Sequence, residues 1–201
     1  MNFLAHLYLS KNNPNIMIGN FIADHIKGNN YEGFSKEIQQ GIFLHRAIDT
    51  YTDAHALVRK SKRRLHKRYG HYGGVIIDIF YDYFLAKNWA KYSEIPFDIF
   101  TDAVNKMFSE VSDDLPIKSQ EFIKYMIAYN LLFNYQFEDG IEKVLNGMNQ
   151  RTKGKSKMNL AIEDLKELNK EFEEDFMLFF EDLRNFSDQK LKEIKKTLWN
   201  N

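Results

Sequence analysis

Asp78 and Asp82 are the only charged residues in the otherwise apolar segment 73–86, GGVIIDIFYDYFLA. On a helix, a spacing of four places both carboxylates on one stripe, together with large apolar side chains. An isolated carboxylate in a dry interior costs several kcal/mol, so it needs a metal ion, an arginine or a proton as compensation. Pairing with a buried arginine or with backbone donors is a common structural solution, and the spacing alone leaves both interpretations open.

The same spacing recurs in two segments nearer the N-terminus. His45, Asp49 and Asp53 follow one another at intervals of four in GIFLHRAIDTYTDAH, and Asn20 and Asp24 do so in GNFIAD. Imidazole with several carboxylates is a ligand set for Mn²⁺, Mg²⁺, Fe²⁺ or Zn²⁺, and a set rich in carboxylates favours the harder ions. A polar role in the core competes for each residue alone, but recurrence on three helices favours one shared site.

The elements that would position these residues all show helical periodicity, and strand alternation is not convincing anywhere. We therefore predict an all-α fold, an irregular bundle in a single domain spanning 1–201. Its metal site would lie within residues 1–90, and the C-terminal helices would act as support or as a dimer surface. The expected helices are 16–27, 35–53, 54–68, 75–90, one from Pro96 to before Pro116, 119–134, 140–148, a long helix carrying Leu165 to Leu183, and a last helix from Ser187.

Composition limits the class of protein. The 201 residues carry 28 basic and 28 acidic side chains, so no overall field favours nucleic acid or a membrane surface. The chain has no cysteine, which excludes disulfides and thiol chemistry and favours a reducing, cytoplasmic location. The N-terminal stretch lacks a basic leader, and no segment reaches the ~20 apolar residues of a membrane span.

One segment is strongly basic. Residues 59–68, RKSKRRLHKR, carry seven Lys or Arg and no acid. Such a helix suits an acidic partner, although most charge runs are simply solvated helix faces. Contact with nucleic-acid phosphates is a third interpretation, which the zero net charge disfavours.

Several strings together resemble the acyl carrier protein phosphodiesterase family, a divergent relative of the HD-domain metal-dependent phosphohydrolases. They are MNFLAHL, GNFIAD followed by KG, GIFLHRAIDTYTD, DIFYDYFLAKNW, and NGM at 146–148. The resemblance implies a helical enzyme that uses a divalent metal, typically Mn²⁺ with Mg²⁺ or Fe²⁺ as alternatives. Such an enzyme hydrolyses the phosphodiester that joins 4′-phosphopantetheine to a serine of holo acyl carrier protein.

With that chemistry in view, we expect the metal to be held by Asp24, His45, Asp78 and Asp82. A bound divalent ion lowers the pKa of its water toward ~7 and neutralises charge on the phosphoryl oxygens. Water would then attack phosphorus in line with the departing serine oxygen.

Five further residues receive expected roles in the same reaction. Arg46 is a candidate clamp for the phosphate, or else a salt-bridge partner of Asp49 or Asp53. Asn20 would bind near the phosphate, and His6 would protonate the leaving serine oxygen, against a competing core role. Asp49 and Asp53 would orient His45 or Arg46.

The expected partner is acyl carrier protein, which is acidic and would dock on the basic segment 59–68. Neither nucleic acid nor a membrane is expected as a partner, and a homodimer is possible. The first alternative function is a metal-dependent phosphohydrolase acting on a nucleotide or another small phosphoester. The second is a non-catalytic helical binding protein.

Overall fold

The structure is a computed structural model that describes residues 3–199, and in that range every regular element is a helix. This confirms the all-α prediction. Short 3₁₀ turns join several of the helices, including Ala23–His25 (η1). The α-helices are α1 (Phe3–Leu9), α2 (Pro14–Ile22), α3 (Lys36–Ala54), α4 (Ala56–Tyr69), α5 (Gly73–Lys87), α6 (Phe97–Val111), α7 (Ile117–Ala128), α8 (Leu131–Asn134), α9 (Glu138–Arg151), α10 (Ala161–Glu167) and α11 (Asn169–Trp199).

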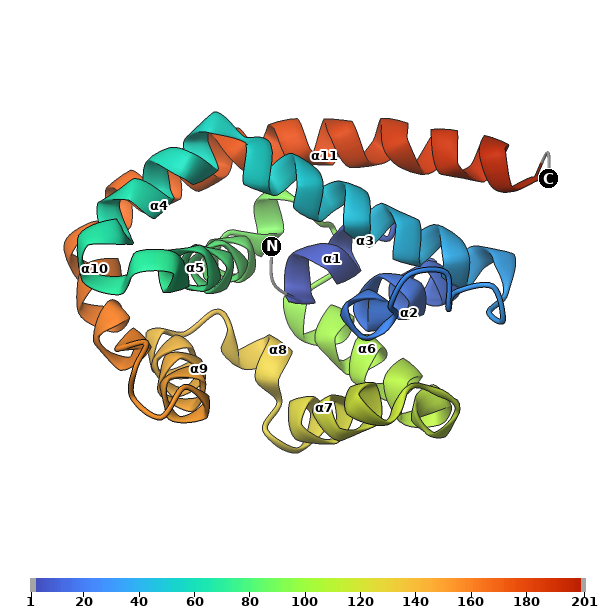
Figure 1. The fold of residues 1–201 in the computed structure, drawn as a ribbon, viewed down its shortest axis with the longest axis horizontal. Coiled ribbons are helices and arrows are strands. Elements are labelled where there is room, and N and C mark those ends of the chain that lie inside the picture. The colour runs from blue at the N-terminus through green and yellow to red at the C-terminus, as the bar shows by residue number, and fades with distance from the viewer. Residues whose placement is uncertain (1–2, 200–201) are drawn as a thin grey trace.

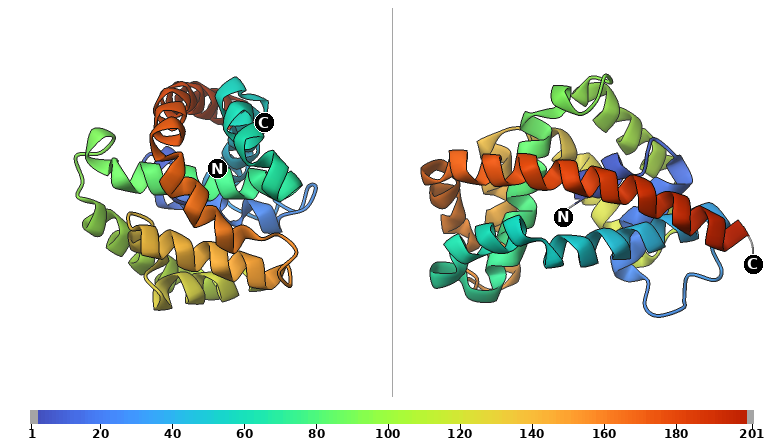
Figure 2. Two further views of the ribbon diagram at one scale, coloured as in Figure 1. Left: turned by 90° about the vertical axis from the view of Figure 1, so that its left-hand side faces the viewer. Right: turned by 90° about the horizontal axis from the view of Figure 1, so that it is seen from above.

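Helix α5 is largely buried, and α1, α4, α9 and α11 pack against it. In Figure 1, α3, α4 and α11 run along the top, α1, α2 and α5 lie in the middle, and α6 to α9 form the lower side. The long α11 packs on both α3 and α4, as the view from above shows (Figure 2). No helix in residues 3–199 combines the length and the apolar character needed to cross a bilayer.

Helices α2 and α3 approach each other very closely at two glycines. A Cβ atom added at Gly19 would overlap the carbonyl oxygen of Ile38, and one added at Gly41 would overlap that of Ile16. Glycine is required here because only its missing side chain lets two helix backbones come this near. The contact brings Asn20 of α2 next to His45 of α3.

Four phenylalanine side chains of α11 belong to the core. They pack against Tyr81 and Phe84 of α5, which are also fully buried. An exposed dimer surface built from these rings is therefore excluded, and a dimer through another face of α11 stays a prediction. The buried rings of α11 are Phe172, Phe176, Phe179 and Phe180.

Several predicted helix boundaries were wrong. The last helix does not begin at Ser187, because that residue is buried inside the unbroken α11. The predicted helix 119–134 divides at Asn130, whose left-handed φ of 45° separates α7 from α8. The predicted helix 16–27 ends at Ile22, and its last turn is replaced by the 3₁₀ turn that carries Asp24.

Candidate metal centre and active site

Three side chains from two helices converge at one point, where both histidines are buried and Asp49 is partly exposed. His6 of α1 and His45 of α3 stack their rings with centroids 4.1 Å apart. Asp49 reaches both rings, with 3.2 Å from Oδ1 to His6 Nε2 and 3.0 Å from Oδ2 to His45 Nε2. Among the described residues, these three offer ligand atoms that all lie within 4.8 Å of one another. We call this set the His6–His45–Asp49 cluster.

Asn20 fixes the orientation of both histidines. Its fully buried amide donates through Nδ2 to the His6 carbonyl oxygen at 2.8 Å and to Ser10 Oγ at 3.1 Å. Its Oδ1 therefore faces His6 Nδ1 at 2.7 Å as an acceptor, while its backbone oxygen lies 2.8 Å from His45 Nδ1. Because each Nδ1 donates to an oxygen, the neutral form of each ring presents its Nε2 lone pair to Asp49. Asn20 thus supports the histidines and has no side-chain atom left for a phosphate.

Asp24 extends the cluster toward solvent. The 3₁₀ turn after α2 places its Oδ1 3.2 Å from His45 Nε2, and 67% of its side chain is exposed. His45 Nε2 is therefore shared by two carboxylates, one buried deeper in the protein and one near the surface. The helix predicted for 16–27 would have placed Asp24 on the α2 stripe instead, so the early end of α2 is what directs this carboxylate to His45.

The cluster is electrostatically coupled. Burial alone would lower the pKa of His45, but the hydrogen bonds that its ring donates to Asp24 and Asp49 raise it to about 9. Burial and the neighbouring charge of His45 lower the pKa of His6 to about 4. Although burial opposes ionisation of Asp49, its contacts with His45 and His6 hold its pKa well below the usual range. The hydrogen bond to His45 also lowers the pKa of Asp24.

These donors fit a divalent ion. His6 Nε2 is buried, and its neighbour at 3.2 Å, Asp49 Oδ1, lies at an ion-pair distance without hydrogen-bond geometry. Two imidazole lone pairs facing a carboxylate repel it unless a cation lies between them. A proton on His45 places a positive charge between that ring and Asp49. A metal ion would place a positive charge between Asp49 and both rings. Metal-binding histidines typically donate their second nitrogen to an oxygen, as both rings do here through Asn20.

The two aspartates of α5 stand apart from this cluster. Asp82 is fully buried and accepts from the backbone N–H groups of Leu4 at 2.8 Å and Ala5 at 3.2 Å. It therefore caps α1, the helix that carries His6, and burial raises its pKa to about 7. Asp78 lies one turn earlier, and burial raises its pKa as well. Neither belongs to the His6–His45–Asp49 cluster, although both were predicted to bind the metal.

Arg46 and Asp53 have other contacts in the structure. Arg46 donates to the carbonyl oxygens of Ile26 at 3.2 Å and Gly28 at 3.1 Å, so it secures the loop after η1. Its predicted role as a phosphate clamp stays a prediction. Asp53 lies one helical turn beyond Asp49 and accepts from Lys62 of the basic segment at 2.7 Å.

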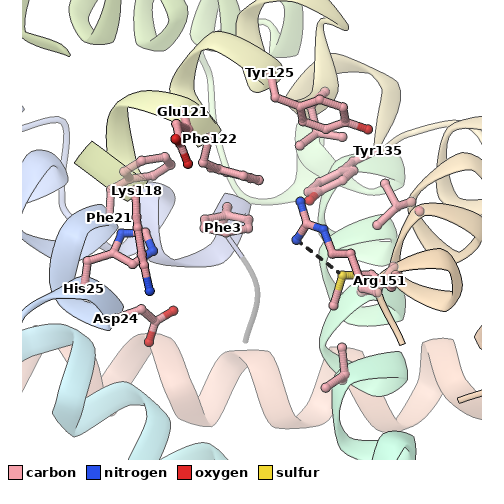
Figure 3. Close-up of a pocket in the computed structure, with 16 residues that line it drawn as sticks. Phe3, Phe21, Asp24, His25, Lys118, Glu121, Phe122, Tyr125, Tyr135 and Arg151 are labelled. Carbon is pink, nitrogen blue, oxygen red and sulfur yellow. Dashed lines mark hydrogen bonds between the residues drawn. The ribbon is translucent and has the colours of Figure 1, made fainter. Parts of the chain in front are cut away.

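A cavity of about 540 Å³ adjoins Asp24, and the sequence analysis did not predict it. Figure 3 shows Asp24 and His25 at one side of it, Phe3 near its centre, and Arg151 at the other side. Gly147 and Met148 of the NGM string also line it. The NGM string is the sequence feature that could have indicated the cavity. It lies far from the other motifs along the chain, yet Gly147 and Met148 line the same cavity as Asp24.

The class of protein follows from this geometry: an all-helical protein with a cluster of two buried histidines and a partly exposed aspartate that is suited to a divalent ion. A family profile described as acyl carrier protein phosphodiesterase matches residues 1–183. The chain belongs to this family, which confirms the resemblance seen in its N-terminal strings and places it among the hydrolases.

Individual relatives carry the same description. The chain is similar to the acyl carrier protein phosphodiesterase of Klebsiella pneumoniae (strain 342), with 29% identity over 191 residues that cover 94% of this chain and 99% of the relative. It is 32% identical over 152 residues to that of Enterobacter sp. (strain 638), covering 75% and 79% of the two chains. The Escherichia coli O127:H6 relative gives the same identity and coverage. No solved structure gives a significant match.

Proposed function

We propose that the protein is a divalent-metal-dependent phosphodiesterase that acts on holo acyl carrier protein. It adds water across the phosphodiester and yields apo carrier protein with a free serine hydroxyl and 4′-phosphopantetheine. The observation that carries the proposal is the His6–His45–Asp49 cluster, a donor set for a divalent ion with two buried histidines and a partly exposed aspartate, in a chain of this family.

The proposed metal ligands are His6 Nε2, His45 Nε2 and Asp49, with Asp24 as the fourth candidate. This set replaces the ligand set predicted from the sequence, in which His6 was a general acid. A bound Mn²⁺ or similar ion would lower the pKa of a water molecule and neutralise charge on the phosphate. Asp82 supports the site from α5 by holding α1 in place.

Asp24 is the residue best placed to move a proton. Its carboxylate is more exposed than that of Asp49, and it faces the cavity (Figure 3). A carboxylate is ionised near neutral pH, so an oxygen of Asp24 could accept a proton from the attacking water. Asn20 holds both imidazoles in orientation throughout, because its own hydrogen bonds do not involve the reacting atoms.

The basic segment 59–68 divides into two faces. Lys60 and Arg64 pair with the buried Asp175 of α11, and Arg68 pairs with Asp164 of α10, so this stripe anchors α4 to the protein. A second stripe consists of the residues that precede these three by one position. It is exposed and borders a basic hollow of about 370 Å³. Its members are Arg59, Arg63 and Lys67. We propose that acidic carrier protein docks on this outer stripe.

The basic segment 59–68 is joined to α3, the helix that carries His45 and Asp49, by one ion pair. Lys62 of α4 pairs with Asp53, which follows Asp49 by one turn of α3. Docking on α4 would therefore place the carrier protein beside the helix that carries His45. A cytoplasmic location, which the absence of cysteine favours, and a homodimer stay predictions.

The test is to incubate the protein with holo carrier protein and Mn²⁺ and to follow the mass of the carrier. Loss of the phosphopantetheine mass, abolished in a folded His45→Ala variant, is the expected result. An unchanged carrier mass would contradict the proposal. Turnover of nucleotides or small phosphoesters instead would favour the alternative phosphohydrolase function.

A further inference from the structure

The cavity beside Asp24 is built mainly from aromatic and aliphatic side chains. Phe3 stacks on Phe122 with ring centroids 4.2 Å apart and contacts Phe21 at 5.4 Å. Val75 and Ile79 of α5 add aliphatic surface to the lining. Its volume of about 540 Å³ lies within the roughly 300–1,000 Å³ that is usual for small-molecule sites. The reaction at phosphorus alone does not require an apolar space of this size.

Polar groups lie at the two ends of this apolar surface. Figure 3 shows Lys118 pointing toward Asp24 and His25, while Arg151 lies beyond Phe3. Arg151 donates to the sulfur of Met148 at 3.8 Å, and a thioether sulfur is a weak acceptor. The arrangement suits a ligand with an anionic end near Lys118, an apolar middle, and polar groups toward Arg151.

We propose that this cavity binds the pantetheine arm, the part of the substrate that leaves together with the phosphate. The identity of the ligand rests on the proposed function. The arm is a flexible amide-linked chain with a geminal dimethyl group next to the phosphate, and it ends in a thiol. Its methyl groups would contact the rings of Phe3 and Phe122, and Arg151 would donate to an amide oxygen. Binding the arm here aims its phosphate at Asp24 and His45.

The order of contacts across the molecule agrees with this assignment. Asp53 joins the basic segment through Lys62, Asp49 and Asp24 share His45, and Asp24 lines the cavity. The carrier protein, the phosphodiester and the arm would follow one another in that order. The substrate has the same order of parts.

Gly147 provides a way to fill the cavity without disturbing the fold. It lines the cavity from α9, and a Cβ atom added to it meets no atom within 4 Å. Leucine also favours a helix over glycine by about 0.8 kcal/mol, so Gly147→Leu should fold at least as well. Gln150→Leu, an exposed change on the same helix, is the matched control.

The first test is binding of free pantetheine, which has no phosphate, to the 201-residue chain with and without Mn²⁺ by calorimetry or ligand-observed NMR. We expect the wild-type chain and Gln150→Leu to bind equally, and Gly147→Leu to bind at least about tenfold more weakly. Wild-type protein that does not bind pantetheine, or Gly147→Leu that binds it normally, would overturn the assignment of the cavity.

The second test is turnover of holo carrier protein. Gly147→Leu should lower kcat/KM by about tenfold or more while its affinity for Mn²⁺ stays unchanged. Normal turnover by Gly147→Leu would overturn the cavity assignment and leave the proposed function intact. Conversely, pantetheine binding that is sensitive to Gly147→Leu in a protein that never hydrolyses holo carrier protein would support the cavity and contradict the proposed function.

Discussion

Asn20 Oδ1 lies 2.7 Å from Nδ1 of His6, and this buried contact determines which ring nitrogen faces Asp49. Replacing Asn20 by alanine removes the acceptor for His6 Nδ1 and frees the ring to adopt the other tautomer. We expect Mn²⁺ affinity, measured by calorimetry, to fall by about 10- to 100-fold.

A control for this prediction is Asn88→Ala. Asn88 also uses its amide fully, donating to the Phe84 carbonyl oxygen and to Glu173, but it lies at the end of α5. The Asn88→Ala substitution should lower the free energy of unfolding without changing the affinity for Mn²⁺. If Asn20→Ala binds Mn²⁺ as tightly as wild type, Asn20 does not orient the ligands.

Asp82 affects the site through α1. Asp82→Ala leaves two buried N–H groups without an acceptor, so the free energy of unfolding should fall by roughly 2 kcal/mol or more. Asp82→Asn keeps an acceptor and should remain folded with nearly unchanged Mn²⁺ affinity. A folded Asp82→Asn protein that has lost Mn²⁺ binding would instead make Asp82 a direct ligand, as the sequence analysis expected.

The raised pKa of Asp82 predicts that the free energy of unfolding depends on pH. The pKa of Asp82 is about 7 in the folded protein against 3.8 for a free side chain, so between these values the folded state holds a proton that the unfolded state has lost. Its contribution to stability is complete below pH 3.8 and is lost as the pH rises to about 7. Chemical denaturation across pH 4–7 should show a shallower decline for Asp82→Asn than for wild type. Parallel curves would contradict this prediction.

Binding of Mn²⁺ should depend on pH through His45. In the metal-free protein His45 has a pKa of about 9, so at neutral pH the ion must displace its proton. Affinity should therefore rise by about tenfold for each pH unit up to about pH 9. Asp24→Asn removes one contact that raises the pKa of His45. The pH at which Mn²⁺ affinity stops increasing should therefore be lower in this variant. Calorimetry in buffers of different ionisation enthalpy would count the released proton, and no release would contradict the prediction.

The two faces of α4 allow a sharp test of docking. Arg63→Glu with Lys67→Glu reverses two exposed charges, and we expect KM for holo carrier protein to rise by about tenfold at low salt and less at high salt. Arg64→Glu is the control, since it breaks a contact with the buried Asp175 and should lower stability by about 1–3 kcal/mol. An unchanged KM in the double variant would exclude this surface.

Local pattern predicted the helices but not the contacts between them. The periodicity of α3 and α5 is strong enough to be recognised in the sequence, whereas α1 has only seven residues and gave no such signal. Within the site, the spacing of His45 and Asp49 predicted their proximity, since both lie on one helix. The capping of α1 by Asp82 joins residues 78 positions apart, and no local pattern encodes it.

The stacking of His6 on His45 could not be predicted for a related reason. It depends on how closely α1, α2 and α3 approach, which in turn depends on Gly19 and Gly41. The break at Ser187 was predicted because serine commonly begins helices, yet burial of Ser187 against neighbouring elements overrides that preference.

Helix α3 sets the distance and the direction between His45 and Asp53. His45, Asp49 and Asp53 lie on one stripe of a single rigid helix, with steps of about 6 Å along its axis. Inserting one residue between Asp49 and Asp53 would turn everything beyond it by about 100°. Under the proposed function, such a variant would keep the His6–His45–Asp49 cluster, but Asp53 and the proposed docking surface on α4 would no longer be aligned with it, so the spacing along α3 would itself determine specificity.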